Sequence, residues 1–176
     1  MVAHIFMIVG FLAAIAMYFK DTRDDILRLS IVSSLFYGLF FIFHVSLTGG
    51  FICLIAILNT IMQIKLFDNT HKSRIIRLGT SCFFAIMGTV FLAENNSDFL
   101  PMFAFIVNCY AEAFEKKNNI FFFYIISLML WTGYSLYNEA YIYTFLNMIL
   151  FAANLIVLNE NMKSKFLSFM KLTPST

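Results

Sequence analysis

The sequence predicts an all-α membrane protein with seven transmembrane helices, arranged as two parallel three-helix repeats joined by a linker helix (3+1+3). Three observations favour this fold class: an apolar composition, seven apolar segments, and Lys and Arg residues confined to alternate connections. Hydrophobic residues make up 61% of the chain and charged residues 12%, whereas soluble domains carry about 25% charged residues. The mean hydropathy of +0.82 is therefore better suited to a lipid bilayer than to water.

The seven apolar segments have lengths close to what a bilayer requires, although several are short and the fifth has only about 16 apolar residues. A helix that crosses the hydrocarbon core needs about 20 apolar residues, within a range of roughly 17–25. The segments are residues 2–19, 26–47, 51–67, 75–93, 99–114, 120–137 and 141–158, and the last can continue to residue 162. No basic residues precede the first segment, as they would in a cleavable signal peptide, so we expect this segment to be retained as a helix.

The connections between the segments contain turn-forming or charged residues. The second segment ends at Thr48-Gly49-Gly50, which predicts a turn. Residues 94–98 are acidic or neutral, and residues 138–140 form another predicted turn. Pro101 falls in the first turn of the fifth segment, where a helix tolerates proline.

All twelve Lys and Arg residues are predicted to lie on one side of the membrane. They flank the first, third and fifth connections or follow the last segment: Lys20, Arg23, Arg28, Lys65, Lys72, Arg74, Arg77, Lys116, Lys117, Lys163, Lys165 and Lys171. Because cytoplasmic loops collect such residues, we expect the N-terminus outside and the C-terminus in the cytoplasm. The basic face predicts contact with anionic membrane lipid, and the net charge of +2 gives no reason to expect nucleic-acid binding.

A comparison of the chain with itself predicts the repeats. An offset of 95 residues, without a gap, places segments one to three on segments five to seven. We therefore expect a first repeat at residues 1–67, a linker helix at 68–98, a second repeat at 99–162 and a cytoplasmic tail at 163–176. Each triplet crosses the membrane three times and one helix separates them, so both triplets enter in the same direction.

Polar residues inside the segments are candidates for a binding site, since polar groups in the hydrocarbon region are costly. Asn59 and Asn154 lie at mid-segment and coincide at the 95-residue offset. Their amides suit a neutral hydroxyl- or amide-bearing ligand, although each Asn can instead bond a neighbouring helix and hold the bundle together.

Aromatic residues extend this candidate site. Trp131 lies at mid-segment, and Phe36 coincides with it at the same offset. The two rings can flank a ligand, or they can pack like other rings of a Phe-rich bundle. Asn108 is a further candidate for polar lining, whereas Tyr37, Tyr134 and Tyr137 can line a cavity or belong to an interfacial belt, and Asn147 can take either place.

Catalytic and metal-binding patterns are missing from the sequence. The cysteines Cys53, Cys82 and Cys109 have no metal-ligand spacing, and no hydrolase, metalloprotease or nucleotide-binding motif occurs. We therefore expect neither an enzyme nor a bound metal or cofactor. Glu112 precedes Lys116 by four residues, which favours an ion pair over a proton relay.

The segment pattern and the residues Leu47–Gln63 (LTGGFICLIAILNTIMQ) resemble a known group of transporters. Two triplets with a linker and a mid-segment Asn in the third helix of each are similar to the SWEET and PQ-loop (MtN3-like) superfamily. Trp131, followed 23 residues later by Asn154, resembles more narrowly the YgjV-type bacterial inner membrane proteins of that clan. The resemblance implies that Asn59 and Asn154 line a substrate pocket.

The leading hypothesis is a SWEET-like inner membrane transporter that moves a small neutral polar solute by alternating access. The alternative is a non-transporting receptor or assembly partner on the same scaffold, because Pro101 is the only proline in the seven segments and no proline hinge is predicted in the first triplet. A homodimer is compatible with either hypothesis.

Overall fold

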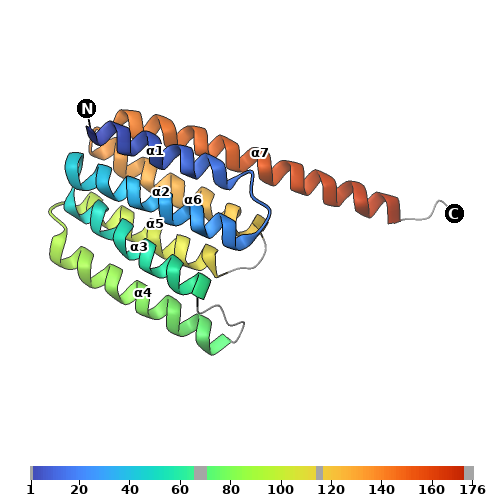
Figure 1. The fold of residues 1–176 in the computed structure, drawn as a ribbon, viewed down its shortest axis with the longest axis horizontal. Helices are drawn as coiled ribbons and strands as arrows, with labels where there is room; N and C mark the ends of the chain where they lie inside the picture. Colours follow the sequence, from blue (N-terminus) through green and yellow to red (C-terminus); the bar gives the residue numbers. More distant parts are fainter. Residues whose placement is uncertain (1, 66–70, 114–116, 173–176) are drawn as a thin grey trace.

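The computed structural model is a bundle of seven α-helices and describes residues 2–65, 71–113 and 117–172. The helices are α1 (Val2–Met17), α2 (Arg23–His44), α3 (Leu47–Lys65), α4 (His71–Leu92), α5 (Phe99–Glu112), α6 (Lys117–Tyr137) and α7 (Tyr141–Leu172), with a short 3-10 helix, η1 (Asn96–Asp98), before α5. Successive helices run in opposite directions (Figure 1), so α1, α3, α5 and α7 share one direction. Each predicted segment is therefore a helix.

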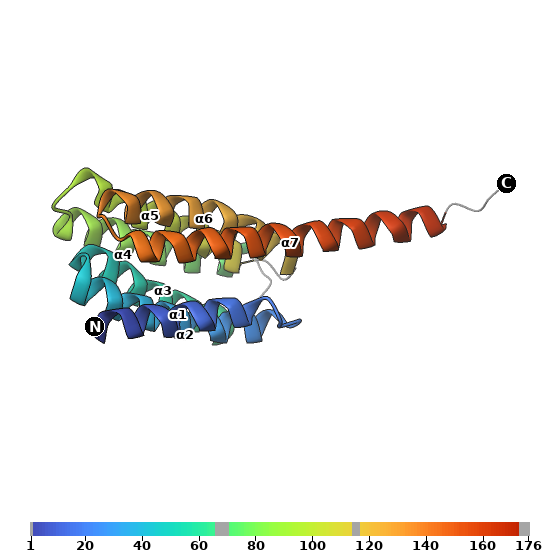
Figure 2. The same ribbon diagram turned by 90° about the horizontal axis from the view of Figure 1, so that it is seen from above.

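The helices form two layers with a seventh helix at one side. Figure 2 shows α1, α2 and α3 in one layer, opposite α5, α6 and α7. Within each layer the middle helix, α2 or α6, packs against both of its neighbours. Between the layers, α1 contacts α7 and α3 contacts α5, while α4 packs against α3 and α5. The layers therefore meet along two helix pairs, only one of which is covered by α4.

The surface of the bundle suits lipid. Five of the described helices are long and apolar enough to cross a membrane: α2, α3, most of α4, α6 and the first part of α7. The helix α1 is apolar but has only 16 residues. Large apolar side chains such as Phe84, Val90 and Phe91 on α4 are exposed at the surface. The architecture is consistent with a multi-pass membrane protein.

The turn between α2 and α3 differs from the prediction. Thr48, Gly49 and Gly50 lie inside the first turns of α3, and the chain reverses direction earlier, at Val45 and Ser46. The hydroxyl of Ser46 accepts a hydrogen bond from the backbone N–H of Gly49 at 3.0 Å and so caps α3. A Cβ atom on Gly50 would stand 2.2 Å from Cγ1 of Ile42. These glycines therefore serve close packing of α3 on α2 and not the turn.

The last helix is longer than expected. We predicted that it ends between residues 158 and 162, but α7 continues to Leu172 and extends past the other helices (Figure 1). Before α7, the predicted turn is confirmed: Glu139 adopts a φ of 56°, and the side chain of Asn138 donates to the backbone oxygen of Tyr134 at 2.9 Å, which satisfies the end of α6.

Candidate functional site

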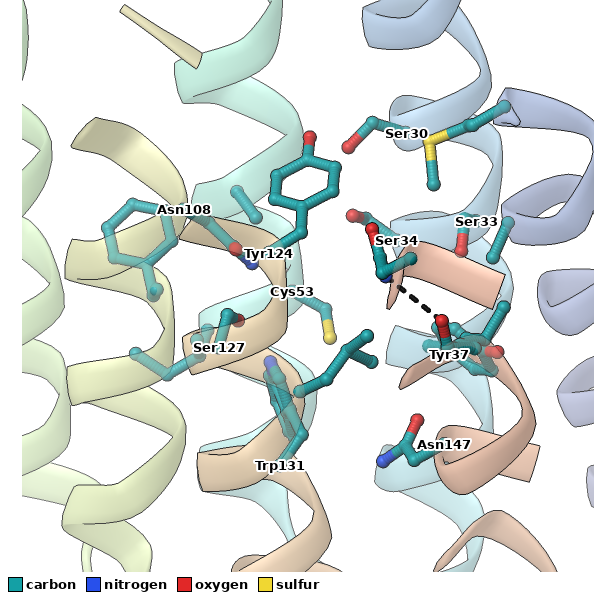
Figure 3. Close-up of a pocket in the computed structure, with 18 of the residues that line it drawn as sticks. Ser30, Ser33, Ser34, Tyr37, Cys53, Asn108, Tyr124, Ser127, Trp131 and Asn147 are labelled. Carbon is teal, nitrogen blue, oxygen red and sulfur yellow. Dashed lines mark hydrogen bonds between the residues drawn. The ribbon is translucent and has the colours of Figure 1, made fainter. Parts of the chain in front are cut away.

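A cavity of about 100 Å³ lies between the two layers. Six helices border it, and α4 is the one that does not. Its lining residues are Ala14, Met17, Tyr18, Ser30, Ser33, Ser34, Tyr37, Ile52, Cys53, Ala56, Phe105, Asn108, Tyr124, Ser127, Leu128, Trp131, Tyr143, Asn147, Leu150 and Asn154. In Figure 3, Asn108 and Ser127 lie on one side of the space, with Tyr37 and Asn147 on the other. No charged side chain belongs to this lining.

Several buried polar atoms on residues that line the cavity have no hydrogen-bond partner among the described residues. They are the hydroxyls of Tyr37 and Tyr124, the amide oxygens of Asn108 and Asn154, and both polar atoms of the Asn147 amide. Asn147 and Asn154 are almost fully buried, with 1% and 0% of their surface exposed. A buried polar group without a partner costs free energy, so such atoms indicate a place for water or a ligand.

Asn154 is held by the segment just after α1, while its side-chain oxygen has no hydrogen-bond partner among the described residues. Its Nδ2 donates to the hydroxyl of Tyr18 at 2.6 Å and to the backbone oxygen of Leu150 at 3.0 Å. The Tyr18 hydroxyl in turn donates to the same Leu150 oxygen at 3.1 Å. These two hydrogen bonds fix the amide, and its oxygen retains an unused capacity to accept a hydrogen bond.

Asn59, the other predicted Asn, lies outside the cavity lining. Its Nδ2 donates to Oε2 of Glu112 at 2.8 Å, and its Oδ1 accepts from the hydroxyl of Ser81 on α4 at 2.9 Å. Both polar ends of the amide are therefore satisfied within the protein. The structure does not bring Asn59 and Asn154 to one cavity, and a solute contact of Asn59 stays a prediction.

Glu112 is the centre of a buried polar cluster next to the cavity. Its carboxylate accepts from the hydroxyl of Thr60 at 2.9 Å and from the amide of Asn59, and the hydroxyl of Ser30 lies 3.5 Å away. Only 3% of Glu112 is exposed. These partners come from α2 and α3 and are neutral. The predicted partner, Lys116, lies outside the described residues.

Two arginines border this cluster at its basic end. Arg23, at the start of α2, donates to the backbone oxygens of Glu112 at 2.8 Å and Gln63 at 3.4 Å. Arg77 of α4 donates through Nε to the side-chain oxygen of Gln63 at 3.2 Å. The last carbonyls of a helix lack partners within it and can accept hydrogen bonds from a basic side chain. Arg23 supplies such bonds and so joins the ends of α3 and α5 to the start of α2.

Only one residue of the predicted aromatic pair lines the cavity, as is also true of the predicted Asn pair. Trp131 lines the cavity and stacks on Phe41 with ring centroids 5.0 Å apart. Phe36 does not line the cavity, and its ring lies 6.2 Å from that of Phe6. Asn108 lines it as predicted. Flanking of a solute by Trp131 and Phe36 stays a prediction.

The structure also locates the three tyrosines and the Asn147 side chain that the sequence left open between a cavity lining and the membrane interface. Tyr37 and Asn147 line the cavity, Tyr137 is 64% exposed, and Tyr134 is buried at the opposite end of the bundle from Arg23. The Tyr134 hydroxyl bonds that of Ser46 and donates to Asp98 at 3.4 Å.

Sequence reasoning missed the polar cluster around Glu112. The sequence analysis gives Glu112 only a possible ion pair with Lys116, yet polar residues from four helices meet around it. Asn59 and Thr60 stand adjacent in the sequence, but Ser30, Ser81 and Glu112 are far from them and from one another. A lone acidic residue within an apolar segment was the only available signal.

The comparisons with known proteins return no relative. No protein-family model matches the chain, and neither a curated protein nor a solved structure matches it.

Proposed function

We propose that the chain is a bacterial inner membrane transporter that carries a small neutral polar solute by alternating access through the cavity between its layers. One observation carries the proposal: Tyr37, Asn108, Asn147 and Asn154 line one cavity and hold buried amide and hydroxyl atoms that have no partner among the described residues. Such a set is what a site for a polar molecule requires.

The chemistry of the lining supports a neutral solute. The amide oxygens of Asn108 and Asn154 accept hydrogen bonds, the Asn147 amide can donate and accept, and the Tyr37 hydroxyl can do either. A charged solute would leave its charge without a counter-charge, since no lining residue is charged. The volume of about 100 Å³ favours a solute no larger than a small polyol or amide in this conformation.

The packing of the helices supports two parallel repeats. A two-fold axis along the membrane normal would place α1 on α5 and α3 on α7, and it would then exchange the α1–α7 contact with the α3–α5 contact. The N-terminus would face outside and the basic ends of the helices the cytoplasm. This arrangement also agrees with the resemblance to the SWEET, PQ-loop and YgjV-type proteins.

Both ends of the cavity would have to open in turn. At the basic end Arg23 joins α2 to α3 and α5, and at the other end Tyr134 bonds Ser46 and Asp98. We infer that the two sets of bonds are the gates of alternating access, because each ties helices of one layer to the other.

A thermal-shift panel of purified protein in detergent tests the proposal. The panel holds polyols, small amides, sugars, nucleosides, vitamins and neutral amino acids. A ligand at about 100 times its dissociation constant stabilises the fold by roughly 2.7 kcal/mol, which is readily measured. We expect a hit that Tyr37→Phe and Asn147→Leu weaken.

Tyr137→Phe is the matched control, because it makes the same chemical change on an exposed tyrosine. A hit that survives both cavity substitutions would contradict the site. A folded protein without any hit would favour the alternative, a receptor or assembly partner, and a stoichiometric partner or a homodimer should then be sought by co-purification.

A further inference from the structure

Glu112 stands where a carboxyl group can hold a proton inside the bundle. It lies in the last turn of α5, buried against α2 and α3. No Lys or Arg side chain within the described residues forms an ion pair with its carboxylate. Burial of a carboxylate favours binding of a proton, whereas hydrogen bonds from Asn59 and Thr60 and the nearby Arg23 guanidinium favour the anion. The surroundings therefore allow both states.

Thr60 can serve both protonation states of Glu112 without a movement of the backbone. Its Oγ1 lies 2.9 Å from each carboxylate oxygen and 2.8 Å from the backbone oxygen of Ala56. A hydroxyl has a single proton to donate. When Glu112 is ionised, Thr60 donates to it. When Glu112 is protonated, its new O–H group can donate to Thr60, and Thr60 then donates to Ala56.

A polar route joins this carboxyl group to the cavity. Ser30 lines the cavity, and its hydroxyl lies 3.5 Å from Oε1 of Glu112. Tyr124 of α6 also lines the cavity and lies close to Glu112. A change of charge at Glu112 therefore alters the electrostatic potential at the cavity wall.

The titratable and charged groups around Glu112 come from four helices. The titratable groups close to it are Arg23 at the start of α2, Tyr124 of α6 and Cys109, one turn earlier on α5. From α4, Arg77 reaches the cluster through Gln63. Among the described residues, Arg23 is a positive group that bonds the backbone of Glu112, so it can balance the ionised state.

We propose that Glu112 is a proton-binding site that couples proton movement to the solute cavity. The step is a simple protonation: a proton from water on one side forms an O–H bond with the carboxylate, and the same bond breaks when the proton leaves to the other side. No redox partner is required. This inference rests on the proposed transport function and adds the coupling ion to it.

Infrared difference spectroscopy of the protein in lipid tests the site with the proton as the only ligand. Spectra are recorded across about pH 4 to pH 9, a range that includes the value of about 4.3 for an unperturbed Glu. We expect a carboxyl C=O band that disappears as pH rises and is absent in Glu112→Gln, a substitution that preserves size. Circular dichroism verifies that the variant is folded.

Thr60 provides a second readout. Thr60→Val removes the hydroxyl and should move the C=O band of protonated Glu112 to higher frequency, because a hydrogen bond is lost. Thr60→Ser retains the hydroxyl and should leave the band in place. A merely structural role of Thr60 would not distinguish these variants in this way.

The proposal is overturned if no pH-dependent band depends on Glu112, since the group would then keep one protonation state. That outcome leaves an uncoupled solute carrier intact. Conversely, absence of any solute hit with a clear Glu112 titration would remove the transport proposal and not the proton site, so the two failures are distinguishable.

Discussion

Asn59 and Asn154 hold equivalent places at the 95-residue offset, yet the protein uses them differently. Each donates its amide protons to a side chain at the end of a helix in the opposite layer: Asn59 to Glu112 of α5, and Asn154 to Tyr18 just after α1. Asn59 also accepts a hydrogen bond from Ser81, whereas Asn154 lines the cavity and its oxygen has no partner within the described chain.

The difference is due to one helix. α4 packs against α3 and α5 and supplies Ser81, and no corresponding helix covers the α1–α7 pair. With a fourth helix present, the polar groups satisfy one another and the site is closed. Without it, an acceptor is left for a ligand. Two residues at equivalent positions can therefore have different roles: Asn59 belongs to a closed polar cluster, and Asn154 belongs to a site that can accept a ligand.

Asn59→Leu should have the largest effect on this comparison. It removes a donor from the buried Glu112 carboxylate and leaves Ser81 without its acceptor. We expect a loss of about 3 kcal/mol in the free energy of unfolding in detergent, because bonds to charged groups are worth roughly 1.5–3 kcal/mol. Leu58→Ala, at the exposed neighbouring residue, should cost far less. Equal losses for the two would contradict a closed polar cluster.

Gly88→Ala tests the docking of α4 that closes the cluster. An added Cβ would stand 1.8 Å from Cε1 of Phe51 on α3. We expect a loss of about 2 kcal/mol, since overpacking typically costs 1–3 kcal/mol. At Gly79, on the same helix, a Cβ meets no atom within 4 Å, so Gly79→Ala should stabilise α4 slightly. The comparison would be weakened if both substitutions behaved alike in thermal unfolding.

Asn154→Leu should cost less than the substitution at Asn59, about 1 kcal/mol. It removes the bond to Tyr18, but its oxygen is unpartnered from the start. The same unfolding assay, run in parallel on both Asn variants, measures the difference directly. If Asn154→Leu proved the more destabilising of the two, the distinction between a closed and an open site would be wrong.

Tyr37→Phe should have the smallest effect, within about 0.5 kcal/mol. The hydroxyl it removes has no partner among the described residues, and loss of an unsatisfied group carries no penalty. Tyr134→Phe makes the same change where the hydroxyl bonds Ser46 and Asp98, and it should cost about 1 kcal/mol or more. A large loss at Tyr37 would show that its hydroxyl holds the fold and is not free for a ligand.

The helices were predictable because hydrophobic length is a local property. The seven segments and the turn at Glu139 follow from the composition of neighbouring residues. The glycines at 49 and 50 misled the prediction because the same residue serves a turn or a close helix contact, and only the position of Ile42 decides which.

The candidate site was half predictable. Asn154, Trp131 and Asn108 line the cavity as expected from their polarity or position. The bonds of Asn59 to Glu112 and Ser81 could not be foreseen, because they depend on how α3, α4 and α5 rotate against one another. A single sequence predicts the rotation of a helix about its axis only approximately. A hydrogen bond between two helices depends on that rotation to within a fraction of a turn.

The length of α7 has a practical consequence for imaging. Its 32 residues span about 48 Å at 1.5 Å per residue, and a bilayer core of about 30 Å takes up only part of that length. A small rigid protein fused in helical register to the end of α7 would inherit the orientation of the bundle. The particle would then gain the mass and the asymmetry that alignment of a 20.3 kDa protein in a micelle demands.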